Sequence, residues 1–314
     1  MPQQTPSQAR VIDPILTVVA RGYRGTQSPV ADVLFPIVPV GARAGRIISF
    51  GLEDFKLVNT ARAPGSNTKR VQFGYASVPY ALVDHSLEGA VPLEILEEGR
   101  EVPGIDHASM AIAKVQNLMA LEREKQAADL ALNAANYAAG NKITLAGNDR
   151  WDVVHADSDP FTDINVGKEA IRSQIGMRPN TLTLGPKVLT ALRSNAKVLD
   201  RLSTASDRPP ATLAQLAALF EVERIVEGTM VYHNGTVFVD VWGTFAHLAY
   251  TTPATMAEMG SPNFGYTYQL SDRPVAREPY WHDNSKTWYY PYDDARQPVL
   301  VGASAGYLIT TAVS

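Results

Sequence analysis

The sequence predicts an α+β fold with an extended N-terminal arm, a long β-hairpin, one long helix and a mixed body. Three observations predict it. Apolar residues in 1–45 follow neither a helical nor a strand period. In 46–84, apolar residues alternate with polar residues or glycine after a turn. The segment 107–138 is Ala-rich and contains no Gly or Pro. Short helical and strand-like segments follow, and the end of the chain is mostly strand-like, as in α+β proteins.

Composition is typical of a globular protein and argues against several function classes. Of the 314 residues, 45% are apolar and 19% are charged, with a net charge of −4. A dedicated nucleic-acid binder is usually basic, so a DNA-coating role is disfavoured. The lack of cysteine excludes disulfides and thiolate metal sites. No apolar run reaches the length of about 18 residues that spans a membrane, and the opening MPQQTP lacks a signal-peptide pattern.

The N-terminal arm, residues 1–45, is broken repeatedly by prolines, among them those at 14, 29, 36 and 39. Its apolar side chains, Phe35, Ile37 and Val38 among them, have little apolar surface near them in the sequence. We therefore expect the arm to lie on another molecule.

The next segment, 46–84, predicts a two-stranded hairpin. Its tip is PGSN at 64–67, and Phe73 and Tyr75 alternate with polar residues or glycine on the return. One side of the hairpin can extend roughly 50 Å at about 3.4 Å per residue, whereas a globule of this length has a radius of gyration of about 20 Å. Because an isolated hairpin is marginal in water, we expect a second molecule to cover it.

The segment 107–138 predicts a helix of roughly 48 Å, with Asp106 as its N-cap and Gly140 after its end. Its apolar stripe is interrupted by EREK at 122–125 and keeps no heptad, which favours one helix lying across a sheet. Further helices are expected at 164–175, 186–195 and 211–220. Strands are expected at 180–184, 224–227, 230–233, 236–241, 246–250, 266–270, 276–281, 288–292, 298–301 and 307–313, with Asn234-Gly235 as a hairpin turn.

No motif predicts a catalytic residue, a cofactor or a metal. GASAG at 302–306 has the spacing of a hydrolase nucleophile turn, but neither an acid nor a histidine follows Ser304, so we interpret it as a turn. HADSD at 155–159 lacks the glycine and the oxygen count of a calcium loop, which favours a solvated turn before Pro160. Glycine-rich phosphate loops are absent from the sequence.

An acidic group precedes the long helix and consists of Glu94, Glu97, Glu98 and Glu101. One interpretation is a solvated rim. The other is contact with Arg62, Lys69 and Arg70 of a neighbour's hairpin, where complementary charge would set registration. Aromatic residues between 280 and 292 flank a DNSK turn, which predicts a hairpin with cross-strand aromatic pairs in a core or subunit interface.

Several segments, taken in order, carry a resemblance. They are VLFPIVPV at 33–40, RAPG at 62–65, NTLTLGP at 180–186, VLDRL at 198–202 and LAQL at 213–216. They resemble the arm, loop tip and central strand–helix region of tailed-bacteriophage major capsid proteins, which have the Hong Kong 97-type fold. The resemblance covers nearly the whole chain.

The resemblance implies a division of the chain into an arm at 1–45, an extended loop at 46–84, a peripheral domain at 85–179 and 263–314 with a spine helix at 107–138, and an axial domain at 180–262. It also implies self-assembly into hexamers and pentamers of an icosahedral head, with a portal and packaged double-stranded DNA nearby. Because the arm begins almost at Met1, a separate scaffolding protein is expected, and a decoration protein is a further possible partner. The chain would be made in the host cytoplasm and located in the virion, with no membrane contact.

On this basis the residues expected to contact another subunit are Phe35, Ile37, Val38, Arg62, Lys69, Arg70, Phe73, Tyr75, Glu97, Glu98 and Glu101. Two other functions stay open. An encapsulin, a cellular compartment with the same fold, would need a groove for a cargo peptide. An enzyme with an unrecognised site in 180–262 would be a compact monomer or small oligomer with a polar cleft.

Overall fold

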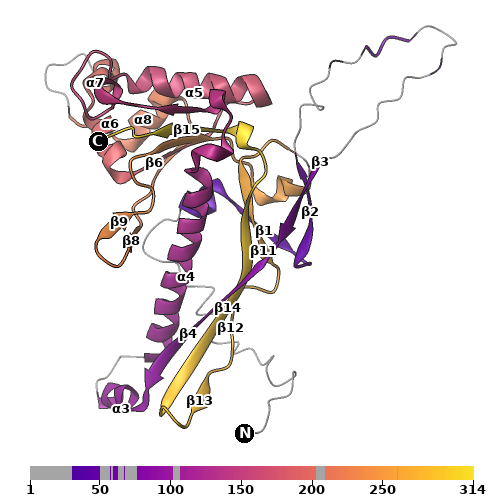
Figure 1. The fold of residues 1–314 in the computed structure, drawn as a ribbon, viewed down its shortest axis with the longest axis vertical. Coiled ribbons are helices and arrows are strands. Elements are labelled where there is room, and N and C mark those ends of the chain that lie inside the picture. The colour runs from indigo at the N-terminus through magenta and orange to yellow at the C-terminus, as the bar shows by residue number, and fades with distance from the viewer. Residues whose placement is uncertain are drawn as a thin grey trace.

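The computed structural model describes residues 30–49, 57, 59–62, 67, 76–101, 107–202, 209–259 and 261–314. The mixture of helices and strands confirms the predicted α+β class. The molecule is elongated, with a sheet and most of its helices at one end, and helix α4 and two long strands leading to the other end (Figure 1). Among the described residues, no helix is both long and apolar enough to cross a membrane.

A five-stranded sheet forms the helix-rich end, in the order β5-β15-β10-β6-β7. Its strands are β5 (Lys142–Thr144), β15 (Gly306–Thr310), β10 (Ala246–Ala249), β6 (Thr181–Leu184) and β7 (Arg224–Glu227). β10 runs antiparallel to β15 and to β6, and every residue of β6 and β10 is buried. Two strands, β5 and β15, come from outside the predicted axial segment 180–262, and the domain division stays a prediction.

Helices cover this sheet, and local sequence signals set their ends. They are α5 (Pro160–Ile175), α6 (Pro186–Ser194), α7 (Ala196–Leu202) and α8 (Leu213–Phe220). The Asp159 side chain caps α5 by accepting the Thr162 backbone N–H at 3.3 Å, and Gly176 ends it with φ 70°. A side chain at Gly167 would collide with Leu248 and Tyr307 of the sheet, so this glycine lets α5 lie close.

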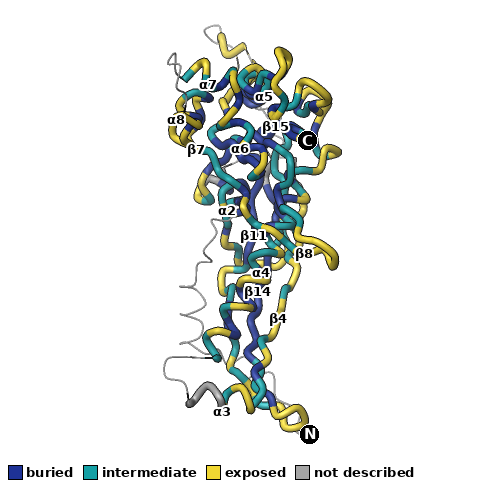
Figure 2. Tube along the Cα trace, turned by 90° about the vertical axis from the view of Figure 1, so that its left-hand side faces the viewer, coloured by how far each residue is buried: buried dark blue, intermediate teal, exposed yellow. Residues whose placement is uncertain are grey.

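A small hairpin leaves the same end of the molecule, formed by β8 (Val231–His233) and β9 (Phe238–Asp240). The hairpin confirms the prediction at Asn234-Gly235, but its connection runs over 234–237. The Asn234 backbone N–H donates to the Val237 carbonyl at 3.1 Å, and Gly235 has φ 98°. Figure 2 shows β8 and its turn protruding as an exposed segment.

The long helix α4 (His107–Ala131) ends seven residues before the predicted position 138. The Asn133 side chain caps a short 3₁₀ turn at Ala134–Asn136, which redirects the chain. The Tyr137 hydroxyl then donates to the Ala131 carbonyl at 2.6 Å and satisfies one of the last helical oxygens.

A second sheet runs along α4 in the order β1-β11-β14-β12, with β4 and β13 also paired to β14. Its strands are β1 (Ile37–Val40), β11 (Gly265–Leu270), β14 (Thr287–Leu300), β12 (Val275–Ala276), β13 (Tyr280–His282) and β4 (Val83–Pro92). The apolar face of α4 packs on this sheet through Ile112, Val115 and Met119, against Tyr290 and Tyr292.

At the far end, β13 and β14 form the predicted aromatic hairpin. Tyr280 stacks on Tyr289 at 5.4 Å between ring centroids, and Trp281 lies 5.6 Å from Trp288. Helix α3 (Leu93–Glu101) follows β4 at this end of the molecule (Figure 1).

The strands β2 (Ala44–Ser49) and β3 (Ala76–Ala81) pair antiparallel and form the base of the predicted hairpin. The Cα partners run from Ala44 opposite Ala81 to Ser49 opposite Ala76. Most of the predicted tip, the segment 1–29 and the predicted cap Asp106 lie outside the described residues.

The arm prediction needs a correction at residues 30–40, which fold on their own body. Helix α2 (Val30–Leu34) packs on α4, and β1 adds to β11 as a parallel strand. Phe35 is fully buried, with its ring 5.4 Å from that of Phe264, and Val38 is 7% exposed. Gly265 leaves room for the Phe35 ring, since a Cβ there would lie 2.4 Å from it.

Candidate assembly surfaces

A buried carboxylate fixes the arm to the rest of the molecule. Glu124, in α4, is 1% exposed and accepts the backbone N–H groups of Val30 at 2.9 Å and Ala31 at 3.0 Å. It also accepts the indole N–H of Trp242 at 2.6 Å. Two of these bonds satisfy free N–H groups at the start of α2, and the three together join three distant segments. Glu124 therefore holds the start of α2 on this chain's own body.

Burial raises the pKa of Glu124 above its ordinary value of 4.5, and the three hydrogen bonds offset this only in part. A raised pKa means that the folded state holds the proton more tightly than the unfolded state does. The stability that this protonation contributes is fully present below pH 4.5 and is lost as the pH rises through the folded pKa.

We expect the pH dependence of unfolding to change when Glu124 is replaced by glutamine. The difference in unfolding free energy, wild type minus Glu124→Gln, should increase as the pH falls from neutrality toward 4, because only the wild type gains from protonation. Urea unfolding at a series of pH values measures this difference. A difference that stays constant over the series would contradict it.

A chain of polar and charged groups links α4 to the second sheet. Arg296, 3% exposed, lies 2.7 Å from Asp294 and donates to the Met119 carbonyl at 2.9 Å. Glu122 lies 3.6 Å from Arg296 and 3.3 Å from the Nδ1 of His85 in β4. The buried Arg296 and Asp294 are tolerated because they are paired, and the contacts of Arg296 with Met119 and with the half-exposed Glu122 hold the helix on the sheet.

A polar cleft of about 700 Å³ lies beside the hairpin base. Arg43 contacts Asp84 at 2.5 Å and thereby lowers the pKa of that carboxyl, while Arg277 is paired with Asp293. The Ser86 hydroxyl donates to Asp293 at 2.5 Å. Acidic and basic groups thus pair with each other along the cleft, and this polar lining is unsuited to capture of a small apolar ligand.

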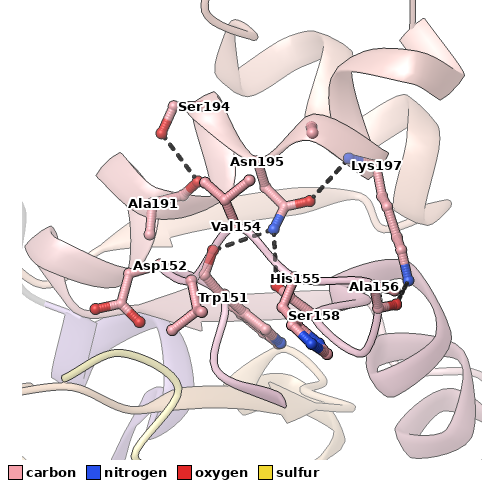
Figure 3. Close-up of a pocket in the computed structure, with 12 residues that line it drawn as sticks. Trp151, Asp152, Val154, His155, Ala156, Ser158, Ala191, Ser194, Asn195 and Lys197 are labelled. Carbon is pink, nitrogen blue, oxygen red and sulfur yellow. Dashed lines mark hydrogen bonds between the residues drawn. The ribbon is translucent and has the colours of Figure 1, made fainter. Parts of the chain in front are cut away.

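Figure 3 shows a smaller pocket, of about 330 Å³, where the loop 151–158 meets the α6–α7 junction. The Asn195 amide donates to the Trp151 carbonyl and to the Ser158 hydroxyl, both at 3.1 Å, and the Lys197 ammonium bonds the Ala156 carbonyl. These contacts tie the loop to the helices. The Asp157 backbone N–H donates to His155 Nδ1 at 3.2 Å, so the predicted turn before Pro160 is held by a local hydrogen bond.

Large apolar side chains remain exposed on several elements of the described chain. They include Leu57 (102%), Val154 (97%), Phe238 (75%), Leu118 (57%), Met110 (48%) and Ile95 (44%). Scattered exposed apolar residues are normal, but Met110 and Leu118 lie eight positions apart on one face of α4, and Phe238 protrudes on a hairpin. Surfaces of this kind are available to a second protein.

The structure places the predicted contact residues in three groups. Phe35 and Val38 are buried in this chain's own core, so the prediction that they contact another subunit is wrong, whereas Ile37 is half-buried. Arg62 and Glu97 are exposed, and Glu98 and Glu101 also lie on α3. Lys69, Arg70, Phe73 and Tyr75 lie outside the described residues, and their role stays a prediction.

The sequence did not identify the exposed β8–β9 hairpin, or the exposed Met110 and Leu118 on α4, as surfaces that could contact another protein. Only the alternation of Val231, Tyr232 and His233 signals that one hairpin face is outward. Within the described residues, no group of three His, Asp or Glu side chains is placed to hold a metal ion.

Comparison with known proteins points to one family. The chain is 33% identical over 309 residues to the major capsid protein of Burkholderia phage BcepMu, covering 97% of both chains. It is 30% identical over 270 residues to the major capsid protein of Pseudomonas phage JBD67, covering 83% of this chain and 84% of the relative. No model of a known protein family matches the chain.

Solved structures agree with this similarity. A phage-related protein from Bordetella bronchiseptica RB50 is 43% identical with a TM-score of 0.78, covering 97% of this chain and 98% of that one. The capsid of cyanophage P-SCSP1u shares the fold at 12% identity and a TM-score of 0.60, covering 92% and 89%. An encapsulin complex from Synechococcus elongatus PCC 7942 shares the fold at 10% identity and a TM-score of 0.51, covering 93% of this chain and 94% of that one.

Proposed function

Because this chain belongs to the family of phage major capsid proteins, we propose that its hairpin and its acidic helix α3 join it to neighbouring copies in the phage head. The chain has the Hong Kong 97-type fold, self-assembles and is located in the virion capsid. In this proposal its oligomers are the hexamers and pentamers of an icosahedral head that encloses double-stranded DNA. The observation that carries the contact proposal is the complete exposure of Leu57, between β2 and β3. An apolar side chain there gains free energy when another copy covers it.

Charge supports the same pairing of surfaces. Glu94 and Glu97 are exposed on α3, at the far end of the molecule from the five-stranded sheet (Figure 1). The sequence places Arg62, Lys69 and Arg70 between β2 and β3. Opposite charges across an interface fix registration and speed association. The basic hairpin of one subunit thus meets the acidic helix of the next.

The segment 180–262 lies at the centre of each hexamer or pentamer in this proposal, and 85–179 with 263–314 lies at its periphery. Synthesis takes place in the host cytoplasm. A separate scaffolding protein, a portal and a decoration protein are the other partners. The names of the sequence relatives support a structural role, and the shared fold alone gives the encapsulin alternative less support than the phage relatives give this function.

Charge reversal on α3 tests the pairing. We expect Glu94→Lys with Glu97→Lys to leave the subunit folded but to lower the yield of closed shells roughly tenfold or more, because a loss of 1.4 kcal/mol per contact is already a factor of about ten. Electron microscopy of the assembled particles measures the yield.

The compensating variant is the control for this test. Reversal of Arg62, Lys69 and Arg70 to glutamate should restore shells when combined with the α3 reversal, and should impair them alone. Failure of the combined variant to recover any shells would contradict the pairing of these two surfaces.

A further inference from the structure

The turn of the β8–β9 hairpin holds three groups around the Asn234–Gly235 peptide bond. The Gly235 backbone N–H donates to His233 Nδ1 at 3.1 Å. The Asn234 side-chain oxygen accepts the backbone N–H groups of Thr236 and Val237, both at 3.0 Å. The whole turn is exposed, and a Cβ added at Gly235 would meet no atom within 4 Å.

These contacts supply a base and donors to the amide oxygen, two of the groups that assist attack of a backbone nitrogen on a side-chain amide. The His233 ring accepts the proton of the nitrogen that would attack, so it can act as a general base. The two backbone N–H groups on the amide oxygen can stabilise the negative charge that develops there, as donors of an oxyanion hole do. The lack of a side chain at position 235 removes steric hindrance to ring closure.

The His233 ring is itself held in place. It lies 5.0 Å from the Phe238 ring, edge-on, and its strand partner in the register is Phe238. Because Nδ1 accepts a hydrogen bond, the neutral ring carries its proton on Nε2. The base therefore faces the nitrogen before any reaction begins, which is the arrangement that positioning requires.

We propose that Asn234 is a self-modifying site, at which the fold promotes conversion of the asparagine to an aspartyl or isoaspartyl residue. The Gly235 nitrogen bonds to the Asn234 side-chain carbon while His233 takes its proton. The bond from that carbon to the side-chain nitrogen breaks, and the nitrogen leaves as ammonia with the proton returned by His233. Water then opens the five-membered imide at either carbonyl. No oxidant or reductant is needed.

The product places a negative charge at the hairpin tip, three residues from exposed Val231 and next in the chain to His233, the register partner of exposed Phe238. The isoaspartyl form also lengthens the backbone by one carbon, which disturbs the bonds to Thr236 and Val237. The exposed hairpin thereby gains an acidic group close to its apolar side chains as the protein ages.

The test compares the folded full-length chain with the same chain unfolded in urea, both incubated at neutral pH. Peptide mass spectrometry follows the mass change of amide-to-acid conversion at Asn234, and incubation in ¹⁸O-water identifies ring opening. We expect conversion in the folded chain to be roughly 100-fold faster, at the low end of what general acid–base catalysis contributes. Equal or slower conversion in the folded chain would overturn the proposal.

Two comparisons isolate the groups involved. His233→Phe keeps an aromatic ring against Phe238 and should remove most of the folded-state acceleration, whereas an unchanged rate would refute the role of the base. Asn284 is an internal control in another exposed turn, where the Ser285 N–H donates to His282 Nδ1 at 3.3 Å. Its side chain has no hydrogen-bond donor in the described structure, so it should convert much more slowly; equal rates at the two sites would also overturn the proposal.

Discussion

Replacement of Glu124 by alanine is expected to lower the unfolding free energy of the unassembled subunit by about 3–5 kcal/mol. The change leaves three buried donors without a partner: the N–H groups of Val30 and Ala31 and the indole of Trp242. Each unsatisfied buried donor costs about 1–3 kcal/mol, and the three share one site, so their effects overlap. A cavity adds to the loss.

Urea unfolding, followed by circular dichroism, measures this change, and Asp129→Ala is the matched control. Asp129 is an exposed carboxylate on the same helix, paired with Lys125 four residues away. Its removal should cost about 0.5 kcal/mol or less. If the two variants unfold at the same urea concentration, Glu124 does not anchor the arm.

The role of Glu124 was invisible in the sequence. The EREK segment at 122–125 looks like an interruption of the apolar stripe on α4, and a charged residue in a helix is most often solvated. Its partners lie 93 to 118 residues away. No local pattern encodes a contact over that distance, so only tertiary packing identifies this carboxylate as buried.

The same reason explains why one long strand was predicted as two. The segments 288–292 and 298–301 were expected as separate strands, whereas β14 runs from Thr287 to Leu300. The charged residues between them, Asp293, Asp294 and Arg296, break the apolar pattern but are buried and paired. Elements that have local sequence signals were predicted more accurately. The β7 strand, for example, was predicted at 224–227, which are its observed bounds.

The candidate surfaces show where sequence reasoning reaches its limit. An apolar segment without local partners predicts contact with something, but the sequence does not say whether that partner is the same chain. Phe35 finds its partner in Phe264 of its own fold, while Leu57 remains fully exposed. The two look alike in the sequence, and the difference arises because β1 reaches an available edge of β11.

Removal of the hairpin tip is expected to abolish shell formation while leaving the subunit folded. Ser49 and Ala76 are direct partners in the register of β2 and β3, so a two-residue Asn-Gly turn can join them in place of 50–75. The described core contacts of the body do not involve the removed residues. Thermal unfolding of the subunit should therefore change little.

Assembly should respond far more strongly, because each subunit would lose an interface with a neighbour. Stable interfaces bury about 800 Å² per partner, and each 1.4 kcal/mol lost per contact weakens it about tenfold. A closed shell repeats that loss at every subunit, so we expect no closed shells in electron micrographs.

A matched pair of point variants separates loss of contact from loss of length. Leu57→Asp removes the fully exposed leucine, while Asn59→Asp adds the same charge two residues away and keeps the oxygen that accepts the Ala61 N–H at 2.9 Å. Leu57→Asp should reduce the shell yield at least about tenfold, and Asn59→Asp should reduce it much less, because only the first substitution removes apolar surface that a neighbour buries. Normal shells from the shortened chain, or equal yields from the two point variants, would show that the hairpin does not join the subunits.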